Sequence, residues 1–70
     1  MNKQEVGNII KQRRISLSLN QEDLSEMAEV TTKTIFSIES GKGNTSLSTL
    51  QKLLEVLGLE LFIQIKKTDE

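Results

Sequence analysis

Hydrophobic and polar positions first alternate with a helical period, from Lys3 to Leu17. The apolar side chains in this segment fall on one helical face, and lysine, glutamine and arginine separate them. They are Val6, Ile9, Ile10 and Leu17. The pattern predicts an amphipathic first helix with one stripe turned toward a core.

A second, shorter helix is predicted to begin at Gln21. Asn20 precedes it and Asp23 follows three residues later, which is typical of an N-cap with an acidic group in the first turn. The face expected to turn inward consists of Leu24, Met27 and Ala28.

A third helix is predicted from Thr32 to Ser40, with Thr31 as its N-cap. Ile35 and Ile38 share its inner face. Gly41 follows and supplies the left-handed residue that commonly ends a helix.

A leucine stripe predicts a fourth helix, with Ser46 as its N-cap and Gly58 as its end. The stripe consists of Leu47, Leu50, Leu53, Leu54 and Leu57. Because a leucine stripe of this kind is usually core, we assign it to the interior.

The period changes to two after Gly58, which predicts a short strand over residues 59–66. One strand cannot satisfy its own backbone hydrogen bonds, and the sequence offers no second strand. We therefore expect a homodimer joined through this segment, whose dimer-forming residues are Leu59, Leu61, Phe62, Ile63 and Ile65. Phe62 lies on the polar side of the strand and is open to burial in a dimer or another partner.

The predicted fold is therefore all-α, a four-helix domain with a short C-terminal strand that pairs across a dimer. We place the domain at residues 1–58, the dimerisation strand at 59–66 and a polar, frayed tail at 67–70.

Composition narrows the function. With no histidine and no cysteine, the sequence lacks the most common metal ligands and the usual general base. The carboxylates form no recognisable catalytic group, so we expect no enzyme, no metal and no cofactor. No segment has the length of a membrane span or the pattern of a signal peptide, and we expect a cytoplasmic protein without membrane contact.

The net charge of -1 argues against a nucleic-acid binder, which is usually more basic. The charges are unevenly distributed, however, and acidic residues concentrate in the second helix. Lysines and arginines stand on either side of it, so one face can still be basic, and a dimer would double its phosphate contacts.

The two short helices around residues 21–40 have the length and connection of a helix-turn-helix. A helix that enters the major groove of DNA needs exposed donors and acceptors near its N-terminus. The third helix offers Thr31, Thr32, Lys33, Thr34 and Ser37. No arginine, asparagine or glutamine is among them, so we expect modest base readout, with DNA shape contributing to specificity.

Two flanking groups are candidates for phosphate contact. Gln21 combines a side-chain amide with the free backbone N–H groups of a helix start. Lys42 and Asn44 follow the third helix and can grip the other flank. Arg13 has two open readings, a phosphate contact or a solvated side chain.

The runs Leu19 to Leu24 and Val30 to Lys42, followed by Leu47 to Gly58, resemble the Cro/C1-type (XRE) helix-turn-helix family. The resemblance implies a lambda-repressor-like fold and a glutamine at position 21 that contacts DNA. It also implies a structural salt bridge between Arg14 and Glu39. Ser37 departs from the family, since many members carry glutamine or arginine at that position.

The segment from Gly43 to Leu47, with Leu57 to Leu61, is similar to the HipB-like subgroup. That resemblance implies a dimeric antitoxin that represses its own operon on a palindromic operator and binds a kinase-like toxin. A stand-alone repressor remains an alternative, as does a protein-interaction module with little DNA binding.

Overall fold

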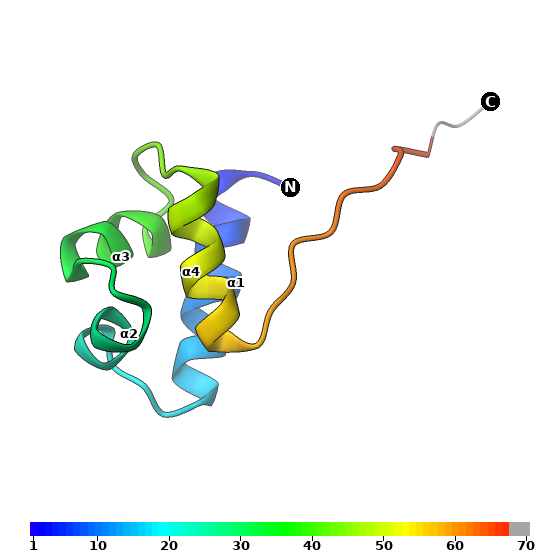
Figure 1. The fold of residues 1–70 in the computed structure, drawn as a ribbon. Helices are drawn as coiled ribbons and strands as arrows, with labels where there is room; N and C mark the ends of the chain where they lie inside the picture. The colour runs from blue at the N-terminus through cyan, green and yellow to red at the C-terminus, as the bar shows by residue number, and fades with distance from the viewer. Residues whose placement is uncertain (68–70) are drawn as a thin grey trace.

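Four helices form the framework of residues 1–67, the part of the chain that the computed structural model describes (Figure 1). They are α1 (Lys3–Ser16), α2 (Gln21–Ala28), α3 (Thr32–Glu39) and α4 (Leu47–Leu57). α1 packs against α3 and α4, and α2 packs against the same two helices. The predicted all-α, four-helix domain is confirmed.

A polar side chain starts each helix by accepting a hydrogen bond from a backbone N–H of the first turn. Asn20, Thr31 and Ser46 do so as predicted. Asn2 is an N-cap that the sequence analysis did not single out. Its side chain accepts from the N–H of Glu5 at 2.9 Å, and the Glu5 carboxylate accepts from the N–H of Asn2 at 3.3 Å.

The helix ends use the left-handed backbone region. Gly58 ends α4 at φ 69°, and Gly41, at φ 76°, follows the last residues of α3. Glu29 ends α2 at φ 57°, although it carries a side chain that disfavours this conformation. The buried Val30 follows directly, so the turn of the chain there is held by packing and not by glycine.

Every helix contributes to one hydrophobic core. Its fully buried side chains are Ile10, Leu24, Ile35, Leu53 and Leu57. Burial of each such side chain contributes roughly 1.5–3 kcal/mol to stability. The core therefore fixes how far apart the four helices lie.

Four residues that the helical pattern assigned to the interior are exposed, and that prediction was wrong: Ile9, Leu17, Met27 and Leu47. Met27 shows the reason. Leu24 and Ala28 fill the contact of α2 with the core, whereas Met27 lies on the other side of Leu24, about 100° around the helix from Ala28, and points away from that contact. A short helix in a small domain buries a narrower stripe than its apolar pattern suggests.

The predicted strand over residues 59–66 does not form in the single chain, and no strand occurs within residues 1–67. Leu59 still belongs to the domain, because its N–H donates to the carbonyl of Leu54 at 2.9 Å. The chain then runs away from the helices (Figure 1). A strand requires a second strand for its ladder hydrogen bonds, and the described residues supply none. Of the predicted tail at 67–70, only Lys67 lies within the described residues.

Gly7 lies where α1 meets α3. A Cβ atom at this position would collide with the carbonyl oxygen of Ile38 and approach the backbone of Glu39 to 3.1 Å. Gly7 is itself buried, so an added Cβ atom could not avoid this contact by pointing toward solvent. The absence of a side chain is what allows the two helices to approach so closely.

We expect Gly7→Ala to lower the free energy of unfolding by about 1–3 kcal/mol, because the added methyl must push α3 away from α1. Alanine would otherwise stabilise a helix over glycine, so the sign of the change tests the packing. Urea unfolding followed by circular dichroism measures it. Asn8→Ala, at an exposed position of the same helix, is the control and is expected to leave stability nearly unchanged. A Gly7→Ala variant at least as stable as the wild type would contradict the close contact.

Candidate nucleic-acid interface

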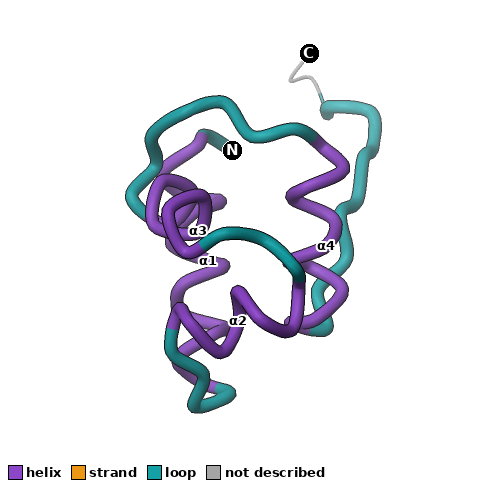
Figure 2. The backbone as a smooth tube through the Cα atoms, turned by 60° about the vertical axis from the view of Figure 1, so that its left-hand side comes forward, coloured by secondary structure: helices purple, strands orange, loops and turns teal. Residues whose placement is uncertain are grey.

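α2 and α3 form a helix-turn-helix unit. Each has 8 residues, and a short connection joins them, visible as the arc between the two helices in Figure 2. Val30, in the middle of that connection, is buried against the core. The two helices also pack directly against each other. The unit is therefore rigid enough to present the outer side of α3 to a partner.

The outer side of α3 is polar near its start and apolar one turn later. Thr32 and Lys33 are exposed, and Phe36 is 62% exposed. Thr34 and Ser37 are half-buried, while Ile35 and Ile38 hold the opposite side in the core. Of the residues predicted to read DNA, Thr31, Thr32 and Lys33 are thus exposed, and Thr34 and Ser37 are less accessible.

Thr31 and Thr34 are already engaged with each other. The Thr31 hydroxyl oxygen accepts from the N–H of Thr34 at 3.2 Å, and the two hydroxyls are 2.9 Å apart. These bonds cap α3 at its N-terminus. A DNA contact by Thr31 would have to share a hydroxyl that holds the helix start.

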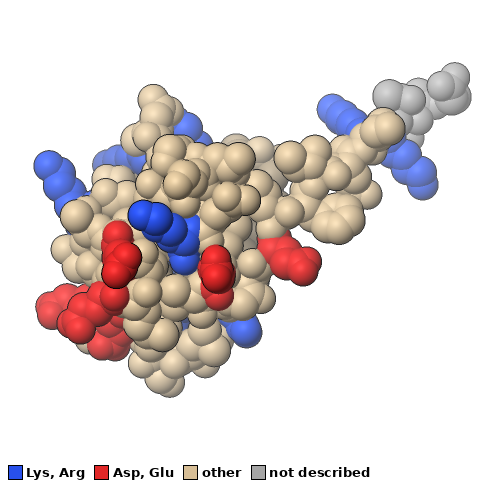
Figure 3. Space-filling model, viewed as in Figure 1, with Lys and Arg blue, Asp and Glu red and all other residues tan. Residues whose placement is uncertain are grey.

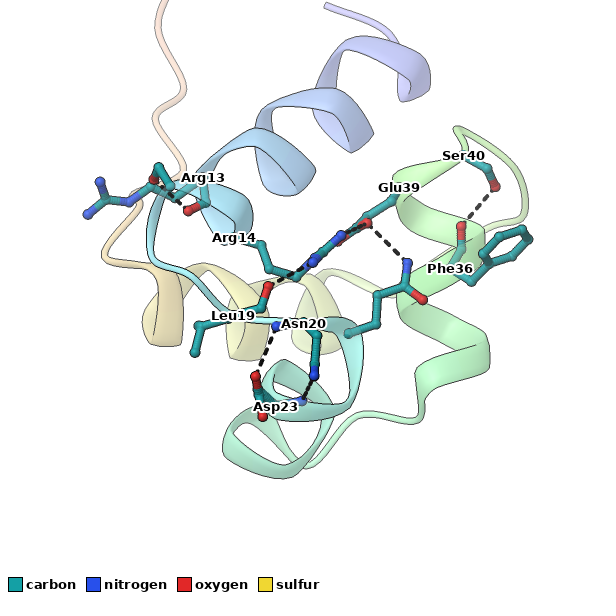
Figure 4. A network of polar contacts seen from close by, with 10 residues as sticks. Arg13, Arg14, Leu19, Asn20, Asp23, Phe36, Glu39 and Ser40 are labelled. Carbon is teal, nitrogen blue, oxygen red and sulfur yellow. Dashed lines mark hydrogen bonds and ion pairs between the residues drawn. The ribbon is translucent and has the colours of Figure 1, made fainter.

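An ion pair joins α1 to the end of α3, as Figure 4 shows. Arg14 Nε donates to one carboxylate oxygen of Glu39 at 2.7 Å, and Arg14 Nη2 donates to the other at 2.9 Å. Arg14 Nη1 donates to the carbonyl of Leu19 at 2.8 Å. The two side chains are only 10% and 4% exposed, so both charges are compensated inside the protein.

The hydrogen bond to Glu39 raises the pKa of the Arg14 guanidinium above its ordinary value, against the opposing effect of burial. A group with a raised pKa in the folded state contributes stability below its unfolded pKa and loses it as the pH rises through the folded pKa. For arginine that loss lies far above neutrality. Arg14 therefore carries its charge throughout the pH range in which a protein works.

Gln21 is held by the same carboxylate. Its Nε2 donates to Glu39 Oε1 at 3.1 Å, which commits one of its two amide hydrogens. The second hydrogen, the side-chain oxygen and the backbone N–H of the helix start remain as contact groups. Gln21 is thus placed beside Thr32, with which it lines one hollow of the surface.

The loop after α3 forms the other flank of this face. Lys42 and Asn44 are exposed, and the loop shares a surface hollow with Lys33 and Ser37. Lys3, at the start of α1, donates from Nζ to Asn44 Oδ1 at 2.7 Å. Sequence reasoning missed Lys3 in this group, because only folding brings positions 41 residues apart together.

Arg13 has a structural partner. Its Nε donates to the carbonyl of Leu57 at 2.8 Å, at the C-terminal end of α4, where a positive charge is favourable. The sequence analysis left Arg13 as either a phosphate contact or a solvated side chain, and it did not predict this bond to α4. The only indications in the sequence were a basic residue late in one helix and a glycine at the end of another.

Charge is unevenly distributed over the surface. Acidic side chains gather at the lower left of Figure 3, where α2 lies in the same view of Figure 1. α2 itself contributes Glu22, Asp23 and Glu26, all exposed. These carboxylates repel a polyanion that approaches the exposed side of α2.

The predicted dimer strand borders an apolar groove between α1 and α4. Leu59, Leu61 and Phe62 line it together with Ile10 and Leu54. Ile63 and Ile65 extend beyond it and are almost fully exposed. Apolar side chains exposed in this way are typical of a surface that associates with another molecule.

The described residues 1–67 contain no group of three or more acidic side chains placed to hold a metal ion. None of the helices in this part of the chain is long and apolar enough to cross a membrane.

Comparison with known proteins identifies relatives. Residues 10–63 match the model of a helix-turn-helix family. The HTH-type transcriptional regulator PuuR of Escherichia coli (strain K12) is 37% identical over 67 residues, and PuuR of Shigella flexneri matches to the same extent. These matches cover 91% of this chain but 36% of each PuuR, so the chain spans about a third of their length.

A second kind of relative is of similar length to this chain. An uncharacterized HTH-type transcriptional regulator of Methanothermobacter thermautotrophicus is 36% identical over 62 residues. The match covers 89% of this chain and 90% of that relative. The helix-turn-helix unit therefore occurs both within a longer regulator and in a protein of about this size.

We expect Glu39→Ala to lower the free energy of unfolding by about 3–5 kcal/mol, because it leaves the Arg14 charge buried without its carboxylate. Thermal unfolding monitored by circular dichroism measures the loss. The double variant Arg14→Met/Glu39→Leu removes both charges and is expected to recover much of it. If the single and double variants are equally destabilised, the cost does not come from an unpaired charge.

Proposed function

This chain belongs to the Cro/C1-type helix-turn-helix family of DNA-binding transcriptional regulators, and from that premise we propose that it binds a palindromic operator as a homodimer. The observation that carries the proposal is the outer side of α3. Its exposed Thr32 and Lys33 lie between two flanks that offer hydrogen-bond donors. A helix presented in this way fits the major groove.

Base readout falls to α3. Lys33 donates to the O6 and N7 atoms of guanine, and the hydroxyls of Thr32 and Ser37 serve several bases. Thr34 and Thr31 have less freedom, since they bind each other. The direct readout is therefore modest, and sequence-dependent DNA shape adds to the specificity.

Phosphate contacts on both flanks set the register of α3 in the groove. On one side, Gln21 offers its remaining amide hydrogen and the N-terminus of α2. On the other side, Lys42 and Asn44 contact the phosphate backbone of the DNA, and Lys3 adds a positive charge beside Asn44. Arg14 and Glu39 do not contact DNA but orient the helices that do.

The C-terminal segment supplies the dimer contact in this proposal. Residues 59–66 of two chains pair as antiparallel strands across a two-fold axis, which satisfies their backbone groups and covers Leu61, Ile63 and Ile65. Phe62 and the groove between α1 and α4 extend the contact. The two α3 helices then reach successive major grooves, about 10 base pairs or a multiple apart.

Bound at a promoter, such a dimer represses transcription by excluding the polymerase. We further propose that it is the antitoxin of a HipBA-like pair and binds a kinase-like toxin, on the basis of the resemblance in residues 43–47 and 57–61. The alternative is a stand-alone repressor. A toxin gene that shares the promoter favours the first, and its absence favours the second.

A protein-interaction module with little DNA binding is the second candidate function. The exposed apolar residues after α4 and the net charge of -1 favour it. The DNA-binding experiment below decides between the two.

We expect Lys33→Ala to weaken binding to a duplex from the upstream region of the gene by about 5- to 150-fold, because a base contact and a positive charge are lost. Gln21→Ala is expected to weaken binding as well, through the phosphate flank. Fluorescence anisotropy at two salt concentrations measures both, with a scrambled duplex for comparison. Lys52→Ala, which removes an equal charge from the exposed side of α4, is the matched control. Equal binding of all variants to both duplexes would reject sequence-specific binding and favour the interaction module.

We expect Ile63→Asp to convert the dimer to a monomer, because two like charges would face an apolar strand contact. Ile63 is exposed in the single chain, so the helical domain should remain folded. Sedimentation equilibrium measures the association, and circular dichroism the fold. Gln64→Asp, on the other side of the predicted strand, is the control. A wild type that stays monomeric, or an Ile63→Asp variant that stays dimeric, would rule out this contact.

A further inference from the structure

Phe36 is an apolar side chain on the outer, otherwise polar side of α3, and it is 62% exposed. Figure 4 shows its ring turned away from the Arg14–Glu39 ion pair. Contact with another apolar group would remove part of this large aromatic ring from water, which is favourable. The position of Phe36 indicates where that group would come from.

Phe36 lies one helical turn after Thr32, and on the helix surface it is a neighbour of both Thr32 and Lys33. Successive helical residues are rotated by about 100°. Phe36 therefore shares the outward sector with Thr32 and Lys33, opposite the buried Ile35 and Ile38. A partner that meets the first turn of α3 also meets Phe36.

Ser37 is less able than Phe36 to meet a partner that approaches the outer side of α3. It is half-buried and faces the loop after α3, where a Cβ atom on Gly43 would lie 3.8 Å from the Ser37 Cβ. In the second turn of α3, the exposed side chain with the greatest reach is the phenyl ring.

The edges of base pairs in the major groove carry hydrogen-bond donors and acceptors and one apolar group, the C5-methyl of thymine. A phenyl ring forms no hydrogen bonds with the donors and acceptors, so covering them would leave polar groups unsatisfied. Contact with a methyl removes apolar surface from water on both sides. Thymine is thus the base that this ring favours.

We propose that Phe36 packs against the C5-methyl of one thymine in each half-site and is a determinant of sequence specificity. The inference rests on the proposed DNA-binding function and adds a contact to it. Phe36 is surrounded on its helix by threonine, lysine and serine, not by other exposed apolar side chains, which is unlike the centre of a protein–protein contact.

The experiment uses the full chain to select duplexes from a randomised pool, and then replaces each thymine of the preferred duplex with uracil, one at a time. Uracil differs from thymine only by lacking the C5-methyl. We expect one position per half-site at which uracil weakens wild-type binding about fourfold, as measured by fluorescence anisotropy. Phe36→Ala should bind the thymine and uracil duplexes equally at that position. Met27→Ala, which truncates an exposed apolar side chain on α2, should behave as the wild type.

Four other outcomes would overturn the inference. If no uracil affects the wild type, or if Phe36→Ala keeps the same sensitivity to uracil, the thymine contact is absent while DNA binding stands. If the pool yields no preferred duplex, the proposed function fails and the contact fails with it. If Phe36→Ala remains folded and binds DNA normally but loses self-association in sedimentation equilibrium, the ring serves a protein contact instead.

Discussion

The Arg14 guanidinium brings together three parts of the chain: the end of α1, the connection before α2 and the end of α3. Each of its three nitrogens donates a hydrogen bond, two to the Glu39 carboxylate and one to the carbonyl of Leu19. A bidentate pair is directional, so it determines the orientation of α3 as well as its distance from α1. Apolar packing alone is less specific, because aliphatic side chains tolerate small rotations of one helix against another.

The same carboxylate reaches the surface through Gln21. Glu39 accepts from the Gln21 amide, so the group proposed to contact phosphate is positioned by a buried ion pair and not by a flexible side chain. On the other flank, Lys3 and Asn44 join the start of α1 to the loop after α3. Both flanks of α3 are thereby tied to α1, which makes α1 the framework on which the candidate interface is built.

Two surfaces of the protein differ in chemistry: the exposed side of α2 is acidic, and the segment after α4 is apolar. The acidic surface of α2 repels a polyanion and therefore limits the directions from which DNA can approach. The segment after α4 is apolar and uncovered, and it lies away from α3 (Figure 1). A dimer formed there would leave α3 of each chain free.

The sequence by itself determined the four helices and most of their boundaries, because capping residues such as Asn20 and Ser46 and the glycine at position 58 act within one turn of the chain. It also pointed to the exposed Thr32 and Lys33, since helical periodicity assigns faces. Only the tertiary structure decided which apolar residues are covered, and it left Met27 and Leu47 outside. It likewise brought Lys3 to Asn44, Arg13 to the end of α4, and α1 onto α3 at Gly7. These features depend on how helices cross, which no local pattern encodes, and a strand after Gly58 depends on a second chain.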